Sequence, residues 1–367
     1  MAAQGDGQLM SLRRLIAVVA LSRALVILAA ILAENIVARN PALTSGDHAP
    51  ILRSLTSWDG WWYLGIVRDG YHVQPIVDGY HDYAFLPLFP LLVRALSFPW
   101  PQFAGLISVA LANAAFAGAI VLFVWLGERV VGRERALVGA ALLAMFPFSA
   151  VFSMAYTESL FLFLAMGAFL AAETDRRPLA GALLALSALT RLQGAVLIVP
   201  LALILFQRDG QRIRPSQAWL LLGPMAALSF IGGVAAFVGS ASAYGAAQAA
   251  WGRPGIGGGA PDQSLLYQLS LPNAIQLLTL LVAIYLLVYL RPDRIPIPYA
   301  LLPIGAILLA FASGSLLSIG RQVMVAFTNS WLLAGRRARW FRFGWPVLSS
   351  VLLLIVSILT FAGWFGP

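Results

Sequence analysis

Long apolar runs alternate with short polar connections along most of the chain. Several runs approach or exceed the roughly 18–20 residues that cross a bilayer as an α-helix, and the pattern predicts about eleven membrane segments, two of them short. They cover about 15–37, 104–126, 136–152, 155–172, two arms within 179–206, and then 217–239, 273–290, 297–312, 321–334 and 344–365. We therefore predict an all-α polytopic membrane protein in which residues 1–367 form a single domain.

The apolar run 179–206 cannot form one straight span. Arg177 precedes it and Arg208 follows it, and short arginine-rich connections favour the cytoplasmic side. Two short helices that meet near 190–194 satisfy both ends and form a V whose apex points away from the cytoplasm. A polar apex at membrane depth must be buried in protein or line a wet cavity.

Composition supports this topology. The chain is 60% hydrophobic and 11% charged, which excludes an ordinary soluble domain. All 24 basic residues are arginine, the net charge is +9, and 16 of these arginines fall in connections predicted to be cytoplasmic. The positive charge therefore indicates membrane orientation rather than nucleic-acid binding. Because the chain has no cysteine, disulfides and thiolate metal sites are excluded.

Two longer segments, 38–103 and 240–272, are predicted to lie outside the cytoplasm as the first and second extracytoplasmic loops. Within the first, residues 84–93 are apolar but too short to span, which predicts an interfacial or re-entrant helix. The N-terminus is predicted to be cytoplasmic, followed by an uncleaved first helix. Arg23 and Glu34 lie on one face of that helix, and we expect both side chains to snorkel toward the two interfaces.

The least expected stretch is Ser57–Leu64, in which Asp59 lies among aromatic residues: Trp58, Trp61, Trp62 and Tyr63. Tryptophan and tyrosine collect where hydrocarbon meets water, because their rings are apolar and their N–H or O–H groups need a polar partner. We therefore expect Asp59 at the membrane surface, where a carboxylate can act on a substrate whose tail lies in lipid.

The predicted topology brings four charged residues to one side of the membrane: Asp59, Glu158, Arg191 and Arg321. Charged groups at membrane depth are costly and usually face a cavity or a partner. Arginine matches phosphate well, because its planar fork donates to two oxygens at once. Two simpler interpretations stay open: Glu158 and Arg191 as a structural ion pair, and Arg321 as a contact to lipid phosphates.

Oxygen and imidazole ligands also occur in the first outer segment, at Asp47–His48, Asp78 and His81–Asp82. Their spacing lacks a helical His-x-x-x-His pair or a closely spaced Asp-x-Asp, so we interpret them as a solvated acidic surface rather than a metal site. No metal ligand is predicted, and the sequence leaves open whether a divalent cation takes part.

Several motifs together resemble one family. They are Ser-Trp-Asp-Gly-Trp-Trp-Tyr (57–63), Asp-Gly-Tyr (69–71), Ala-Phe-Leu-Pro-Leu-Phe-Pro-Leu (84–91), Tyr-Thr-Glu-Ser-Leu-Phe (156–161), Thr-Arg-Leu-Gln-Gly (190–194) and Leu-Ser-Ile-Gly-Arg (317–321). This set resembles the PIG-V-type mannosyltransferases, which are related to the enzyme that adds the second mannose of the GPI anchor and are also found in bacteria.

The resemblance implies a GT-C glycosyltransferase that transfers a sugar, usually mannose, from a polyprenyl phosphate with inversion, on the non-cytoplasmic face. By position, Asp59 matches the carboxylate taken as catalytic, and Glu158, Arg191 and Arg321 match polar positions of the family's motifs. We expect Arg191 and Arg321 to contact the donor phosphate and stabilise its charge. The residues expected to bind or support substrate are Trp58, Trp61, Trp62, Tyr63, Tyr156, Glu158 and Gln193. Gln322 and Thr328 depart from the pattern, where Tyr and Pro are expected.

The acceptor implied by the resemblance is a lipid-linked molecule or a glycan, and the short loops suggest a bacterial plasma membrane. Two other classes of protein stay open. A lipid or glycolipid transporter would carry charged residues along a two-sided path, whereas a membrane scaffold would use none of these residues for chemistry.

Overall fold

A computed structural model describes residues 11–77, 79–251, 271–289, 295–313, 319–335 and 339–366. Within these ranges the regular elements are helices, together with two isolated β-bridges. Four of the described helices are long and apolar enough to cross a membrane: Leu12–Asn35, Pro101–Val130, Pro215–Val238 and Gly344–Ala362. The prediction of an all-α membrane protein is confirmed, and the number of eleven spans stays a prediction.

Long helices and short helical turns follow one another along the described chain. In order they are α1 (Leu12–Asn35), α2 (Pro50–Leu55), α3 (Asp59–Asp69), η1 (Asp82–Ala84), α4 (Leu88–Ser97), η2 (Pro101–Phe103), α5 (Ala104–Val130), α6 (Arg133–Ala144), η3 (Ser149–Phe152), α7 (Glu158–Glu173), α8 (Arg177–Ala188), α9 (Gln193–Val196), α10 (Ile198–Arg208), η4 (Pro215–Leu221), α11 (Leu222–Val238), α12 (Ala243–Ala250), α14 (Leu271–Tyr289), α15 (Ile297–Ser313), α16 (Ile319–Val325), α17 (Thr328–Ala334) and α18 (Arg339–Ala362).

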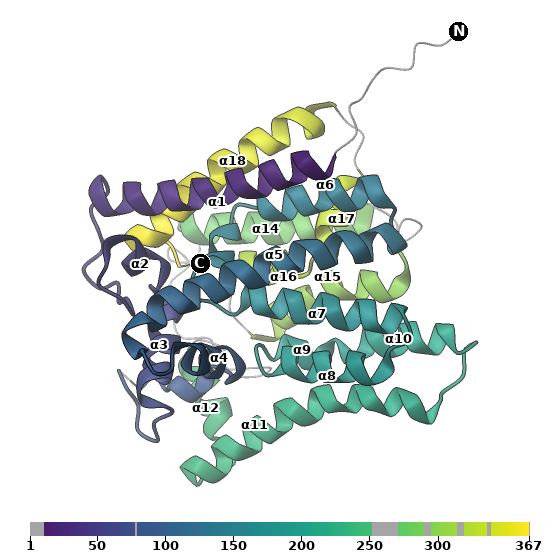
Figure 1. Cartoon of the computed structure of the whole chain (residues 1–367), viewed down its shortest axis with the longest axis horizontal. Helices are drawn as coiled ribbons and strands as arrows, with labels where there is room; N and C mark the ends of the chain where they lie inside the picture. Colours follow the sequence, from purple (N-terminus) through teal and green to yellow (C-terminus); the bar gives the residue numbers. More distant parts are fainter. Residues whose placement is uncertain are drawn as a thin grey trace.

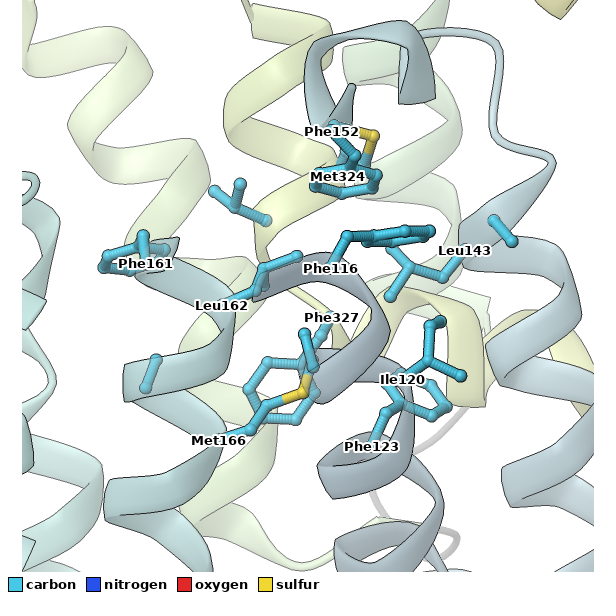
Figure 2. Packing of buried hydrophobic residues seen from close by; sticks show 14 of the residues in the cluster. Phe116, Ile120, Phe123, Leu143, Phe152, Phe161, Leu162, Met166, Met324 and Phe327 are labelled. Carbon is cyan, nitrogen blue, oxygen red and sulfur yellow. The ribbon is translucent and has the colours of Figure 1, made fainter. Parts of the chain in front are cut away.

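Helices α5, α6 and α7 form the middle of the bundle (Figure 1). The pair α1 and α18 packs along one side of it, and α8 followed by α11 covers the opposite side. Aromatic and sulfur-containing side chains fill the centre, where Phe116 stacks on Phe152 at a centroid distance of 4.5 Å and Phe327 lies beside Met166 (Figure 2). This packed centre is the scaffold on which the polar residues are held.

The V predicted within 179–206 is present as α8 and α9–α10, which fold back on each other. Arg177 Nη2 lies 2.7 Å from Asp209 Oδ1, so the two open ends of the V are joined by an ion pair. At the apex, a Cβ on Gly194 would overlap the backbone of Ser187 and Ala188. Only glycine fits where the two arms approach this closely.

Helices α2, α3, α4 and α12 gather at one end of the bundle, which we name the α3 end (left in Figure 1). The two segments predicted to be extracytoplasmic meet there: Trp62 and Trp251 lie 5.2 Å apart between ring centroids, and Gln248 Nε2 donates to the carbonyl of Ala84 at 2.8 Å. Residues 252–270 of the second segment lie outside the described residues.

The run 84–93 forms a short helix, as predicted, although the helix starts later and ends later than the run. Helix α4 buries Phe89 and Val93 and exposes Leu91 and Leu96. It packs on α3 and on the start of α5. Its two unlike faces suit an interfacial position, with one face on protein and the other toward lipid.

Two predicted spans differ in the structure. In the run 136–152, helix α6 ends at Ala144. Phe146 precedes Pro147, and a residue in that position is biased away from helical geometry. The run 321–334 is divided into α16 and α17 with neither proline nor glycine at the break. Asn329 Nδ2 donates to the carbonyl of Val323 at 2.9 Å, which satisfies a backbone group freed by the break.

The prediction that Arg23 and Glu34 snorkel is wrong. The partly buried Arg23 donates from Nη1 to the carbonyl of Ser149 at 2.9 Å and from Nη2 to the carbonyl of Ala144 at 3.2 Å. The carbonyl of Ala144 is available because α6 ends at this residue, before Pro147, and Ser149 begins the short η3 that follows. Glu34 instead pairs with Arg39 and Arg53 within the protein.

Candidate active site

Asp59 is the first residue of α3 and lies at the α3 end of the bundle. Trp58, which precedes it, has a positive φ of 58° and donates from Nε1 to the carbonyl of Thr360 at 2.9 Å, so the start of α3 is tied to α18. The backbone N–H of Asp59 donates to Tyr156 Oη at 3.2 Å. The Asp59 side chain is 25% exposed, which leaves its carboxylate within reach of a molecule outside the bundle.

Four charged side chains, from α3, α16, α7 and the V apex, form one continuous chain of ion pairs. Asp59 Oδ2 lies 2.7 Å from Arg321 Nη1. The same Nη1 lies 3.3 Å from Glu158 Oε1, and that oxygen lies 2.6 Å from Arg191 Nη1. The four residues that the sequence placed near one another are thus in direct contact, and we name them the apex cluster.

The apex cluster is buried but not saturated with hydrogen bonds. The side chains of Glu158 and Arg321 are 1% and 5% exposed. Among the residues that the structure describes, Glu158 Oε2 and Arg191 Nε have no hydrogen-bond partner. A buried polar atom left in this state costs about 1–3 kcal/mol. The pairing of Glu158 with Arg191 is therefore real, but it leaves one acceptor and one donor for a ligand.

Neighbouring polar groups hold the cluster in place. Thr157 Oγ1 accepts hydrogen bonds from Arg191 Nη1 at 3.3 Å and from Tyr63 Oη at 3.5 Å. Burial, followed by the nearby charge of Asp59, raises the pKa of Tyr63 above its ordinary value, so its hydroxyl stays protonated and able to donate. Thr157 was not among the predicted site residues, although it lies next to Glu158 in the Tyr-Thr-Glu motif.

The start of α16, which carries Arg321, is fixed by close packing. A Cβ on Gly320 would overlap the ring of Phe148. The N–H of Gly320 donates to Gln276 Oε1 at 2.6 Å. Gln276 was also missed from the sequence, where it is one of two amides, with Asn273, in the otherwise apolar start of α14.

The other predicted site residues surround the cluster at different distances. The Tyr156 ring lies under the guanidinium of Arg321, 5.2 Å from ring centroid to Cζ. Trp61 and Trp62 meet edge to face, with centroids 4.9 Å apart, on a cavity that the apex cluster does not line. Gln193 begins α9, two residues after Arg191, and is half-buried.

Potential metal ligands do not converge in the described part of the chain, where no group of three or more His, Asp or Glu side chains is arranged to hold an ion. The interpretation of these ligands as a solvated acidic surface is wrong for Asp82, which is buried and lies 2.8 Å from His72 Nδ1. Asp78 lies outside the described residues.

More than half of the sequence is similar to one family of known proteins. Residues 11–211, which include Asp59, Glu158 and Arg191, match the family described as Mannosyltransferase (PIG-V). No curated protein matches the chain. Among solved structures, a crystal structure of the Archaeoglobus fulgidus oligosaccharyltransferase, tethered to an acceptor peptide, is similar with a TM-score of 0.49 and 14% identity; the likeness covers 98% of this chain and 56% of that one.

The chain therefore spans little more than half of the length of the oligosaccharyltransferase. The match to a mannosyltransferase family does not favour the alternative that the chain is a lipid transporter. Because the family match covers more than half of the sequence, the chain belongs to the PIG-V mannosyltransferase family.

Proposed function

We propose that the protein is an inverting GT-C glycosyltransferase that moves mannose from a polyprenyl-phosphate donor to a lipid-linked or glycan acceptor. The observation that carries the proposal is the apex cluster, in which Asp59 lies 2.7 Å from Arg321 and a shared carboxylate, Glu158, joins Arg321 to Arg191. A carboxylate beside two joined guanidinium groups suits a base next to a phosphate site.

Arg191 and Arg321 would bind the donor phosphate. Guanidinium groups bind phosphate oxygens through parallel charge-assisted hydrogen bonds. Glu158 contacts both arginines through one oxygen, which keeps the two guanidinium groups close together despite their like charge. The N–H at Arg191 Nε, which lacks a partner among the described residues, is a donor that a phosphate oxygen would satisfy.

The reaction would be a single displacement at the anomeric carbon. Asp59 accepts the proton of the acceptor hydroxyl as its oxygen forms the new bond to that carbon. The bond from the carbon to the phosphate oxygen breaks, and its electron pair leaves with the polyprenyl phosphate. Arg191 and Arg321 stabilise the negative charge that develops on the leaving phosphate. Attack opposite to the leaving group inverts the anomeric centre.

An amphiphilic donor suits this position in the molecule. The cluster lies at the end of the bundle where α4 exposes Leu91 and Leu96, and Phe98 beyond it is 81% exposed. Such side chains favour contact with lipid, so the polyprenyl tail would stay in the membrane while the phosphate reaches the arginines. We propose that this end faces away from the cytoplasm of a bacterial plasma membrane, with the N-terminus inside.

The proposal predicts transfer of mannose from polyprenyl-phosphate mannose to lipids extracted from the source membranes, measured with the purified protein in proteoliposomes. The substitution Asp59→Asn, which keeps the shape and removes the base, should lower turnover by about 10²–10⁴-fold. Asp175→Asn, at an exposed carboxylate near Arg177 at the open end of the V, is the matched control and should leave turnover unchanged. Turnover at the wild-type level in a folded Asp59→Asn protein would exclude Asp59 as the base. Repeating the assay with a chelator tests whether a divalent cation takes part.

A further inference from the structure

Helix α3 has a second face that the apex cluster does not use. Trp61, Gly65 and Arg68 lie along this face and line a cavity of about 880 Å³, which we name the α3 cavity. Residues 45–48, 72, 74–76, 101, 102, 104 and 105 form much of the remaining wall. The volume falls within the roughly 300–1,000 Å³ of small-molecule sites.

The glycine at position 65 favours the binding of a ligand in the α3 cavity. It lies inside α3 with an ordinary helical backbone, and a Cβ built on it would meet no atom within 4 Å. Glycine inside a helix is less stable than alanine by about 0.5–1 kcal/mol, and one reason to keep it is the close approach of a ligand to the backbone. Because no contact with the described residues requires this glycine, its missing side chain leaves room for a molecule in the cavity.

The polar groups of the cavity are fixed in position. His72 is held through Nδ1 by the buried carboxylate of Asp82, 2.8 Å away, while its side chain is 45% exposed on the cavity wall. Asp47 Oδ1 accepts the N–H of Ala49 at 2.9 Å, and a Cβ on Gly105 would overlap its carboxylate. These groups offer well-placed partners for the hydroxyls of a ligand.

The charge of the cavity argues against an anionic ligand. Among the described residues that line it, the carboxylates are those of Asp47 and Asp69, and the guanidinium is that of Arg68, which is already paired with Asp69 at 2.8 Å. Such a lining has no surplus positive charge for phosphate, unlike the two arginines of the apex cluster. It suits a neutral molecule rich in hydroxyl groups.

Aromatic side chains form one wall of the α3 cavity. Trp61 and Trp62 both line the cavity, and the ring of Trp62 is backed by Phe85 at a centroid distance of 5.7 Å. Rigid aromatic rings suit the apolar faces of sugar rings, while the polar groups around them contact the hydroxyls.

We infer that the α3 cavity binds a neutral saccharide portion of the acceptor, beyond the hydroxyl that reacts. This inference rests on the proposed function, because it needs an acceptor that carries sugars. Trp62, which also lines the cavity, follows Asp59 by three residues in α3 and lies on the same side of the helix, so a glycan bound against Trp62 would direct one hydroxyl toward the base.

The test replaces Gly65 by residues whose side chains occupy part of the α3 cavity. The purified protein in nanodiscs is titrated with mannotriose, with binding followed by saturation-transfer NMR. Gly65→Trp should abolish binding, and Gly65→Ala should weaken it less, because the effect follows the volume added. The matched control is Gly233→Trp, at an exposed glycine of α11 where a Cβ also meets no atom within 4 Å. In the transfer assay, Gly65→Trp should raise the acceptor KM and leave the donor KM unchanged.

Equal binding of mannotriose by the wild type and Gly65→Trp, or no binding by the wild type, would overturn the inference. So would a change in the donor KM alone, since the cavity would then hold part of the polyprenyl donor. If Gly65→Trp lowers the Tm, His72→Ala tests the same cavity from its wall and should also weaken mannotriose binding. Failure of the proposed function is distinguished by the absence of mannose transfer in the wild type itself.

Discussion

The two ends of the V-shaped segment carry similar residues in different states. At the open end, Arg177 donates to Asp175, Asp209 and Ser216, and Asp209 also accepts from Gln217. At the apex, Arg191 pairs with Glu158, yet one buried atom of each has no partner among the described residues.

We propose that this difference separates a structural ion pair from a binding site. Both ends join an arginine to a carboxylate at less than 3 Å. The open end uses its hydrogen bonds internally and so holds the two arms together. The apex retains unused donors and acceptors at a stability cost, which is expected where a ligand completes the network.

The largest effect is expected from Glu158→Gln. The substitution removes the buried carboxylate that Arg321 and the half-buried Arg191 share, and breaking a buried ion pair typically costs about 3–5 kcal/mol. We expect a large fall in Tm in detergent together with loss of transfer. Glu128→Gln, at the exposed pair with Arg133, is the control and should change the free energy of unfolding by less than about 1 kcal/mol. Equal effects of the two substitutions would remove the distinction between a buried and an exposed pair.

The next effect concerns binding rather than stability. Arg191 contacts Thr157 and Glu158 through Nη1 alone, so Arg191→Lys can keep the charge and these contacts but loses the other guanidinium nitrogens, Nε among them, that a phosphate would use. Loss of a charge-assisted hydrogen bond of about 1.5–3 kcal/mol should raise the donor KM by roughly 10–100-fold, while the Tm changes little. Steady-state kinetics with polyprenyl-phosphate mannose measure this. An unchanged donor KM would exclude Arg191 from the phosphate site.

A smaller loss of stability is expected from Gly194→Ala at the apex. The new Cβ would overlap the backbone of Ser187 and Ala188, so the arms must separate, and overpacking typically costs about 1–3 kcal/mol. Thermal unfolding of the purified protein measures it. Gly233→Ala, where a Cβ meets open space, should be neutral or stabilising. A neutral Gly194→Ala would mean that the arms are not closely packed.

The smallest expected change is the variation with pH of the stability contributed by the open end, which should be flat around neutral pH. Hydrogen bonds from Arg177 and then Gln217 lower the pKa of Asp209 below its ordinary value. Its stabilising contribution is therefore fully present above the unfolded pKa of about 3.9 and is lost as pH falls through the lower folded value. The Tm difference between the wild type and Asp209→Asn should stay constant from pH 5 to pH 8 and shrink in stronger acid. A difference that disappears between pH 5 and pH 8 would contradict the assignment.

The sequence predicted the V and the four charged residues because both follow from the cost of placing charge in a membrane. Arg177 and Arg208 fix the side on which the arms end, so the polar apex must lie at the other end. The contact between Asp59 and Arg321, 262 residues apart, follows from the same parity of spans. Its 2.7 Å geometry does not, because it depends on how α16 packs against α7.

Other features could not be predicted because they depend on tertiary contacts. The partners of Arg23 include carbonyls at and just after the end of α6, and no local pattern indicates that α1 lies beside that break. The break between α16 and α17 lacks a proline or glycine and is satisfied by Asn329. The α3 cavity requires segments 45–48 and 101–105 to meet one face of α3, which the sequence leaves open.

The most direct measurement compares Asp59→Asn with Asp209→Asn, with turnover per folded molecule and Tm recorded for both. We predict that Asp59→Asn loses about 10²–10⁴-fold in mannose transfer and keeps its Tm, whereas Asp209→Asn keeps its turnover and loses Tm. Wild-type turnover in Asp59→Asn, or an equal loss of turnover in both variants, would contradict the claim that the apex cluster performs the chemistry and the open end holds the fold.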